Sequence, residues 1–200
     1  MKPKFITFEG GEGSGKTTQS KRLFEYLKSQ NIKCIWTREI GGTVVAEKIR
    51  DIILHNEMDH MTELLLIMAA RKEHVDKVVL PALRDGATVI CDRFVDSTLC
   101  YQGFYVGLST VLDLHKKICG DFMPDLTFFI DVPVAEGLKR AGARGGNNKF
   151  EDKDVTEHER IRSCFLDLVK LFPKRVLRVD GMQSEDEVSR DVLDILNASY

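Results

Sequence analysis

Apolar residues along this chain form five short continuous runs, and the stretches between the runs carry apolar residues at helical spacing. The runs cover residues 5–8, 34–37, 87–91, 126–130 and 176–179. Continuous apolar character over four or five residues is typical of strands that are buried on both faces of a parallel sheet. Strands and helices that alternate in this way form β-α-β units. The pattern therefore predicts an α/β fold, with a doubly wound five-stranded parallel sheet and helices on both faces.

Helix boundaries are marked by local sequence signals. Thr156 with Glu159, and Ser184 with Glu187, show the three-residue spacing of a capping box. This spacing predicts that one helix begins at each pair. Pro133 suits the first turn of a further helix, because the missing N–H of proline has no partner in that turn.

Two other stretches depart from a regular helical pattern. Pro81 lies inside the apolar pattern of residues 61–84 and is expected to kink or divide that helix, because proline removes a backbone hydrogen bond. Residues 140–153 have no apolar periodicity and change from basic to acidic. This composition predicts a mobile loop between two helices.

Length and composition narrow the class of protein. A chain of 200 residues suits one compact domain, so we expect residues 1–200 to form a single domain with one excursion at about 140–153. The net charge of −2 lacks the basic excess of a dedicated nucleic-acid binder. The apolar runs are far shorter than the ~20 residues of a membrane span, and the five cysteines lack disulfide or zinc spacing. We therefore expect a cytoplasmic protein with no membrane or nucleic-acid partner.

A glycine-rich segment follows the first predicted strand and opens a predicted helix. Residues 10–17 read G-G-E-G-S-G-K-T, which fits the phosphate-binding pattern G-x-x-x-x-G-K-[ST]. Lys16 would reach the β- and γ-phosphates and the Thr17 hydroxyl would hold Mg²⁺, while backbone N–H groups at the helix start surround the phosphates. The predicted nucleotide-binding residues are Gly10, Gly11, Glu12, Gly13, Ser14, Gly15, Lys16, Thr17 and Thr18.

Further polar residues follow the second and third predicted strands. Arg38 comes after the second run, and Asp92 with Arg93 ends the third. Side chains at the carboxyl ends of parallel strands face the crevice where such proteins bind ligands, and an arginine there can hold a phosphate through two hydrogen bonds. The alternative is that Asp92 and Arg93 pair only with each other and bind no ligand. Arg71 follows a long apolar stretch and could equally be a cation on a helix surface.

Other functional signals are weak. A switch GTPase needs D-x-x-G, and no aspartate stands three residues before a glycine. Residues 148–151 read N-K-F-E and lack the final Asp of the guanine-reading N-K-x-D, so we interpret them as a coincidence. The five histidines, at positions 55, 60, 74, 115 and 158, show no metal-ligand spacing and are expected on polar helix faces or in loops.

The order and spacing of several motifs carry a resemblance that covers nearly the whole chain. They are F-E-G-x-E-G-x-G-K-T-T at 8–18, T-R-E-x-G-G-T at 37–43, A-A-R at 69–71, D-R at 92–93, S-T-x-x-Y-Q-G at 97–103 and D-V-P at 131–133, with the basic loop at 140–151. Together they resemble the bacterial thymidylate kinases of the nucleoside monophosphate kinase group. The resemblance implies a P-loop NTPase fold with a short basic lid. It also implies ATP- and Mg²⁺-dependent phosphorylation of dTMP to dTDP in dTTP synthesis, and a homodimer.

The resemblance also implies roles for individual residues. Glu12 would accept a hydrogen bond from the 3′-hydroxyl of dTMP, and Tyr101 would pack under the sugar. Arg38 and Arg93 would hold the acceptor phosphate, while Arg71 and Thr98 would bind the thymine edge. The further predicted dTMP contacts are Ile67, Ser97 and Gln102; the predicted catalytic residues are Lys16, Arg93, Arg140 and Arg144; and the predicted metal contacts are Thr17 and Asp92, where Asp92 would orient Mg²⁺-bound water or Arg93.

The chain departs from the family pattern at several positions. Ile40 replaces the usual proline of T-R-E-P-G-G, and Ile67 and Met68 stand where an aromatic ring usually stacks on thymine. In the basic loop, Gly142 and Lys149 stand where arginines are common, which leaves more of the charge to Arg144. Two other readings stay open: a P-loop kinase of another small acceptor, such as AMP, UMP or shikimate, and a regulatory P-loop ATPase.

Overall fold

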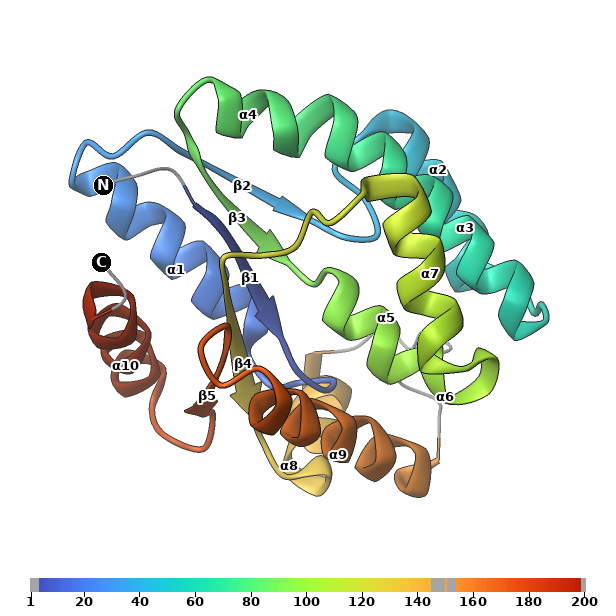
Figure 1. Cartoon of the computed structure of the whole chain (residues 1–200). Helices are drawn as coiled ribbons and strands as arrows, with labels where there is room; N and C mark the ends of the chain where they lie inside the picture. Colours follow the sequence, from blue (N-terminus) through green and yellow to red (C-terminus); the bar gives the residue numbers. More distant parts are fainter. Residues whose placement is uncertain (1–3, 145–149, 151–153, 199–200) are drawn as a thin grey trace.

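In the computed structural model, which describes residues 4–144, 150 and 154–198, five parallel strands form a sheet with helices on both faces (Figure 1). The strands are β1 Phe5–Glu9, β2 Cys34–Arg38, β3 Thr88–Asp92, β4 Leu126–Asp131 and β5 Val176–Asp180. Their order across the sheet is β2-β3-β1-β4-β5. The chain thus extends the sheet first to one side of β1 and then to the other, which confirms the predicted doubly wound architecture.

The helices alternate with the strands as the apolar pattern predicted. They are α1 Lys16–Ser29, α2 Val44–His55, α3 His60–His74, η1 Val75–Val79, α4 Leu80–Arg84, α5 Val95–Tyr101, α6 Gly103–Val106, α7 Leu108–Cys119, α8 Val134–Arg144, α9 Val155–Leu171 and α10 Glu185–Ala198. Within the described residues, no helix is both long and apolar enough to cross a bilayer.

Each strand ends one polar residue later than its apolar run. The last residues of β1, β2 and β3 are Glu9, Arg38 and Asp92. In the sheet register Asp92 pairs with Phe8 on one side and with Arg38 on the other. Because these strand ends are level, the loops that follow β1, β2 and β3 all leave the sheet at one edge, and this edge carries the candidate site.

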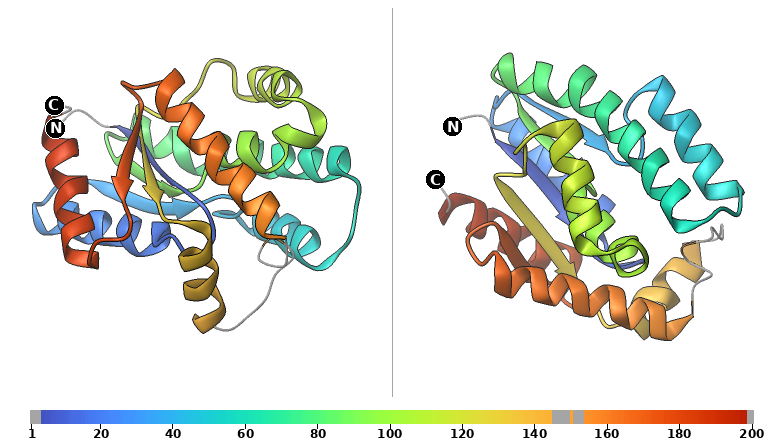
Figure 2. Two further views of the ribbon diagram at one scale, coloured as in Figure 1. Left: turned by 90° about the horizontal axis from the view of Figure 1, so that it is seen from below. Right: turned by 45° about the vertical axis from the view of Figure 1, so that its right-hand side comes forward.

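Helices cover the two faces of the sheet with separate apolar cores. On one face, α1 and α10 pack on the sheet through residues that include Leu23 and Val192. On the other face, η1 and α4 cover one part of the sheet and α3, α5, α7 and α9 form a second cluster. Figure 2 shows α5 and α7 lying on that second face beside α3. This arrangement places α3 and α5 next to the edge where the strands end.

The long helical pattern before β3 is divided, as predicted. The chain leaves α3 at His74, passes through the π-helical turn η1, and enters α4 with Pro81 in its first turn. Proline tolerates this position because its missing N–H has no partner in the first turn of a helix. The wider turn of η1 therefore takes up the irregularity one turn before Pro81.

Two of the predicted helix boundaries are wrong, and one is confirmed. Ser184 and Glu187 make the reciprocal capping bonds, since the Ser184 N–H donates to the Glu187 carboxylate at 3.0 Å and the Glu187 N–H donates to the Ser184 hydroxyl at 3.4 Å. Thr156 lies inside α9, because Asp154 caps that helix by accepting from the Glu157 N–H at 2.8 Å. The carboxylate two residues earlier competes successfully for the helix N-terminus.

The second wrong boundary concerns the predicted loop at 140–153. Helix α8 continues to Arg144, so the first five residues of that stretch are helical. Ala141 is buried beside the P-loop, and this contact holds the helical turn that the sequence pattern lacked. The remaining residues of the stretch, apart from Phe150, lie outside the described residues. Pro133 immediately precedes α8 and accepts a hydrogen bond from the Gly137 N–H at 3.0 Å.

Candidate active site

The P-loop connects β1 to α1 and holds its lysine inward. Lys16 is almost fully buried, and its Nζ donates to the Gly11 carbonyl at 2.6 Å and to the Ser14 hydroxyl at 3.4 Å. Burial and the nearby charge of Arg93 lower the pKa of Lys16 to about 8. The loop therefore places a cation at the start of α1 whose present partners are atoms of the loop itself.

The P-loop also packs tightly against α8. Gly13 has a φ of +66°, and a Cβ there would overlap the carbonyl of Gly137. In turn, a Cβ on Gly137 would lie 2.5 Å from the carbonyl oxygen of Glu12. Glycine at both positions allows this approach. Any side chain at position 13 would therefore collide with α8.

The predicted metal contacts, Thr17 and Asp92, lie together. The Thr17 hydroxyl donates to Asp92 Oδ2 in a short hydrogen bond. The other oxygen, Oδ1, is buried and has no hydrogen-bond partner among the described residues. A buried carboxylate oxygen without a partner is costly unless a ligand satisfies it. Oxygen donors of this kind, beside a P-loop hydroxyl, fit Mg²⁺ and its bound water.

Arg93 stands between the P-loop and the helices on the other side. Its backbone adopts a φ of +69°, which is strained for a residue with a side chain. The guanidinium donates to Glu12 at 2.5 Å, to the Ser97 hydroxyl at 3.0 Å and to the Gly10 carbonyl at 3.1 Å. It also lies 5.0 Å over the ring of Tyr101. Arg93, the predicted phosphate-binding arginine, is therefore held in place by the P-loop on one side and by α5 on the other.

Glu12 is a preformed hydrogen-bond acceptor. Burial favours its neutral form, but the charges of Arg93 and Lys16 outweigh this and lower the pKa of Glu12 to about 2. The Tyr101 hydroxyl donates to the same carboxylate at 2.8 Å. An ionised carboxylate at the mouth of the pocket can accept from a sugar hydroxyl, which is the role that the resemblance implied.

Two more arginines line the pocket around the P-loop, which we call the P-loop pocket and which has a volume of about 420 Å³. Arg38 pairs with Glu47 at 2.8 Å and stays about 43% exposed. Arg50, on α2, donates to the Ile40 carbonyl at 3.1 Å. Burial and the charges of Arg38 and Arg93 lower the pKa of Arg50. Arg38, Arg50 and Arg93 thus line one pocket. Arg50 carries no sequence signal that could have identified it.

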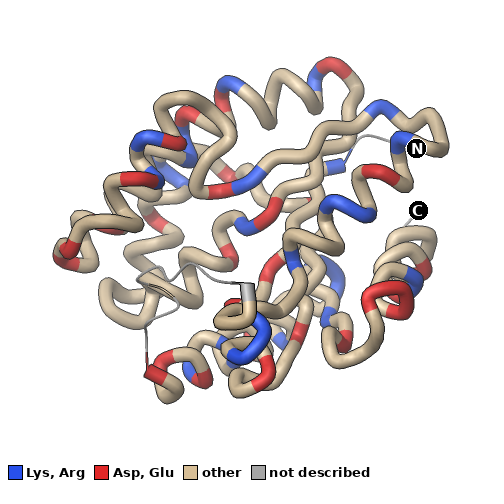
Figure 3. Tube along the Cα trace, turned by 180° about the vertical axis from the view of Figure 1, so that it is seen from behind, with Lys and Arg blue, Asp and Glu red and all other residues tan. Residues whose placement is uncertain are grey.

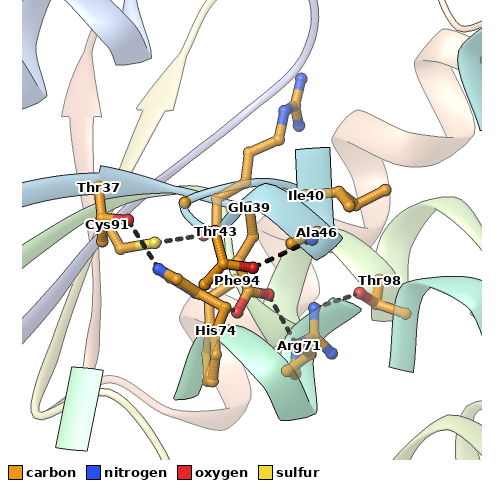
Figure 4. Close-up of polar contacts among 12 residues, drawn as sticks. Thr37, Glu39, Ile40, Thr43, Ala46, Arg71, His74, Cys91, Phe94 and Thr98 are labelled. Atoms are coloured by element: carbon orange, nitrogen blue, oxygen red, sulfur yellow. Dashed lines mark hydrogen bonds and ion pairs between the residues drawn. The ribbon is translucent and has the colours of Figure 1, made fainter. Parts of the chain in front are cut away.

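A second pocket, of about 120 Å³, is lined by Arg93 and Glu12 and by residues of several elements, α3 and α5 among them; we call it the α3–α5 pocket. Its lining includes the predicted acceptor residues Ile67, Arg71, Ser97, Thr98, Tyr101 and Gln102. The Arg71 side chain, which could have lain on a helix surface, is buried and donates to Thr98 at 2.8 Å and to Glu39 at 2.8 Å (Figure 4). The amide of Gln102 is already paired with Glu63 at 2.8 Å.

Glu9 orients the start of α5 and was not singled out by the sequence. It accepts from the Phe94 N–H at 2.7 Å and from the Ser97 hydroxyl at 2.5 Å. Burial, together with the charge of Asp96, raises the pKa of Glu9 to about 7. Because Ser97 also accepts from Arg93, Glu9 acts on the arginine through Ser97.

The histidines differ from the expectation at three positions. His74, His115 and His158 are buried, with exposed fractions of 0%, 3% and 3%. His74 lies between Glu39 and Thr37. A single histidine among polar neighbours in the sequence gives no sign that other elements will cover its side of the helix. The prediction that these histidines lie at the surface is wrong for this reason.

The two basic residues predicted for the lid are placed differently. Arg140 donates to Glu136 at 2.9 Å and to the Gly181 carbonyl at 2.9 Å, so the structure does not bring it together with the P-loop lysine. Arg144 ends α8, and its side chain lies outside the described residues. Lys149 is outside them as well. Figure 3 shows Lys and Arg interspersed with Asp and Glu along the trace, including on α8.

Comparison with known proteins gives one consistent result. The model of the family "Thymidylate kinase" matches residues 8–192. The thymidylate kinase of Rickettsia africae is 51% identical over 175 residues, which are 86% of each chain, and that of Orientia tsutsugamushi is 48% identical over 97% of this chain and 93% of its own. A crystal structure of thymidylate kinase from Ehrlichia chaffeensis superposes with a TM-score of 0.80 and 35% identity, over 98% of this chain and 99% of that one. The chain belongs to the thymidylate kinase family.

Proposed function

We propose that this protein transfers the γ-phosphoryl group of ATP to dTMP. One observation carries the proposal: the P-loop pocket and the α3–α5 pocket share Arg93 and Glu12 in their linings, and the α3–α5 pocket is also lined by Arg71 and Thr98. The donor nucleotide and the acceptor then approach from opposite sides of Arg93. The names of the relatives and of the solved structure support dTMP as the acceptor.

The reaction needs charge and positioning more than a base. The second pKa of a phosphate monoester is about 6, so the attacking oxygen of dTMP is largely ionised at pH 7. Lys16 holds the β- and γ-phosphates, while Arg93, Arg38 and Arg50 hold the acceptor phosphate in line with them. No general base is required. This agrees with a site that is rich in arginine, and whose carboxylate Glu12 is already held by Arg93 and Tyr101.

Mg²⁺ fits the pair formed by Thr17 and Asp92. Bound there, it would neutralise charge that develops on the β- and γ-phosphates. The Thr17 hydroxyl would contact the ion directly, and the unpartnered Oδ1 of Asp92 would accept from water bound to it. Support for this proposal comes from that buried oxygen, which has no other partner among the described residues.

Arg144 is proposed as the cation that meets the transferred phosphoryl group when the segment at 140–153 closes as a lid. The sequence also predicts Arg140 as a catalytic residue. Its hydrogen bonds to Glu136 and Gly181 favour a structural role instead, in which Arg140 connects α8 to the loop after β5. We further propose that residues 1–200 act as one domain with this lid.

A homodimer in the cytoplasm completes the proposal. Residues 64–68 form an apolar stretch of α3, and their side chains differ in exposure. Leu64, Ile67 and Met68 are core residues, while Leu65 is 50% exposed. Other exposed apolar side chains on α3 and α7 are Met61, Leu108 and Leu112. Helices α3 and α7 pack against each other, so these side chains can form one apolar face that suits a second copy of the chain.

A panel of nucleoside monophosphates tests the proposed function. Purified protein is incubated with ATP, Mg²⁺ and each of dTMP, dUMP, dCMP, AMP and UMP, and diphosphate products are separated by chromatography. We expect dTDP to form fastest. A preference for another monophosphate would identify a different kinase. Slow ADP release that no monophosphate accelerates would indicate a regulatory ATPase.

A further inference from the structure

A continuous network of hydrogen bonds joins four segments of the protein (Figure 4), and three of its residues, Glu39, Arg71 and Thr98, line the α3–α5 pocket. Thr37 on β2 contacts His74 Nε2 at 2.7 Å, and His74 Nδ1 contacts Glu39 Oε1 at 2.9 Å. Glu39 Oε2 accepts from Arg71 Nε at 2.8 Å, and Arg71 Nη2 donates to Thr98 at 2.8 Å. The residues come from β2, the loop after it, α3 and α5.

The residues of this hydrogen-bond network are buried. His74 is 0% exposed, Arg71 2% and Glu39 5%. Burial alone would raise the pKa of Glu39, but the Arg71 charge and the His74 hydrogen bond lower it. A buried carboxylate is tolerated only when its lone pairs are satisfied in good geometry. Each partner therefore fixes the rotation of the Glu39 carboxylate, and the carboxylate in turn fixes Arg71.

This arrangement leaves one edge of the Arg71 guanidinium available. Nε is bonded to Glu39 and Nη2 to Thr98, whereas Nη1 contacts only the Met68 sulfur, at 3.9 Å, among the residues that the structure describes. The guanidinium lies 4.8 Å over the Phe94 ring. Since Arg71 lines the α3–α5 pocket, Nη1 is the donor that a ligand in this pocket can meet.

His74 is held as firmly as the residues it supports. A Cβ on Gly42 would lie 2.5 Å from the His74 ring, so the loop after β2 packs directly on the imidazole. Because Glu39 is an acceptor only, Nδ1 carries a hydrogen and donates to it, and in the neutral ring Nε2 accepts from the Thr37 hydroxyl. Both ring nitrogens are thus used, and the ring cannot turn without losing both bonds.

We propose that His74 is a positioning residue that sets base selectivity, by holding Glu39 so that Arg71 Nη1 donates to a carbonyl oxygen of the pyrimidine. The inference rests on the proposed phosphorylation of dTMP. Thymine presents a carbonyl acceptor at position 4, whereas cytosine presents an amino donor there. A fixed arginine donor accepts the first and rejects the second, and a loosened one discriminates less.

The test compares two acceptors that carry the same 5-methyl group but differ at position 4, carbonyl in one and amino in the other, and in the N3 proton that goes with that change. We would measure kcat/KM for dTMP and for 5-methyl-dCMP with wild type, His74→Leu and His74→Asn. Loss of a hydrogen bond to a charged group corresponds to about a 10- to 100-fold change. We expect His74→Leu to lower the dTMP preference by that factor, mainly through KM for dTMP, with KM for ATP unchanged. The amide of His74→Asn can replace the Nδ1 donor, so we expect it to retain most of the preference.

Val79→Ala is the matched control, because Val79 is fully buried on η1 and takes no part in the hydrogen-bonded chain. We expect Val79→Ala to lower the free energy of unfolding while leaving the preference for dTMP over 5-methyl-dCMP unchanged. An unchanged preference in His74→Leu, or an equal loss in Val79→Ala, would overturn the inference. If His74→Leu does not fold, His74→Asn is compared with His74→Gln, whose amide reaches the Nε2 position, and equal preferences would overturn it. A wild type that does not phosphorylate dTMP would instead refute the proposed function.

Discussion

The P-loop pocket and the α3–α5 pocket share Arg93 and Glu12, yet they are built in opposite ways. The P-loop is one contiguous segment, and its buried cation Lys16 is satisfied by the loop's own Gly11 carbonyl. The α3–α5 pocket draws on separate elements, and its buried cation Arg71 is paired with a carboxylate from another loop.

This difference separates the two tasks of the site. In the P-loop pocket the ligand must replace contacts that the protein makes with itself, so binding there changes the state of Lys16. In the α3–α5 pocket Arg71 and Glu39 hold each other before any ligand arrives, so the pocket selects a ligand without changing its own charges. Substitutions in the two regions should therefore have different signatures in catalysis, stability and pH dependence.

The largest effect is expected from Lys16→Ala. The variant loses a fixed cation at the transferred phosphates, and loss of one preorganised electrostatic contact lowers kcat by about 10²- to 10³-fold. Thermal unfolding should stay normal, because alanine leaves no charged group buried without a partner. Steady-state kinetics with ATP and dTMP measure the first effect and calorimetry the second. Lys28→Ala, on the exposed part of the same helix, is the control. Retention of more than a tenth of wild-type kcat would argue against the P-loop assignment.

Arg71→Met should affect stability and binding together. The substitution leaves Glu39 buried with His74 as its remaining side-chain partner among the described residues. Breaking a buried ion pair from one side costs about 3–5 kcal/mol of the free energy of unfolding. KM for dTMP should also rise, since the base loses its donor. Urea unfolding and steady-state kinetics would measure both effects.

The double variant Arg71→Met with Glu39→Gln separates the two contributions of Arg71. It should recover part of the lost stability, because the buried charge is gone, but it should not recover KM for dTMP. Equal stability of the single and double variants would show that the ion pair does not hold this pocket together.

The same contrast explains how much the sequence could predict. The strands and the P-loop depend on contiguous residues, so the apolar runs and the spacing from Gly10 to Thr17 were sufficient to locate them. Arg50 and His74 depend on which helix face is covered, which a local pattern does not specify. Glu39 lies inside a recognised motif, but its pairing with Arg71 needs two elements to meet. The misplaced α9 start has the same origin, because Asp154 and Thr156 are both good caps and only the path of the chain decides between them.

The pH dependence of ligand affinity should also distinguish the P-loop pocket from the α3–α5 pocket. The pKa of Lys16 is lowered to about 8 in the free protein, and the phosphates of ATP favour its charged form. Binding above pH 8 therefore requires proton uptake, so the affinity for ATP should fall about tenfold between pH 7 and pH 9. The pKa of Glu12 is about 2, so this carboxylate does not titrate in that interval.

Calorimetric titrations in two buffers of different ionisation enthalpy would measure both the affinity and the protons taken up. With dTMP, we expect a constant affinity between pH 8 and pH 9, where Glu9, whose pKa is about 7, is already ionised. An ATP affinity that does not change with pH would show that Lys16 keeps its charge in the free protein.

The smallest effect is expected at Ile67, which lines the α3–α5 pocket and stands where the resemblance to the family implies an aromatic ring. A ring there can stack on the base, and stacking of this kind contributes about 1–3 kcal/mol. Ile67→Phe should therefore tighten dTMP binding by about tenfold while leaving the affinity for ATP unchanged. Leu65→Phe adds the same ring to the exposed face of α3 and serves as the control. Weaker dTMP binding would show that the ring overpacks the pocket. Affinity within a factor of about two would show that residue 67 does not contact the base.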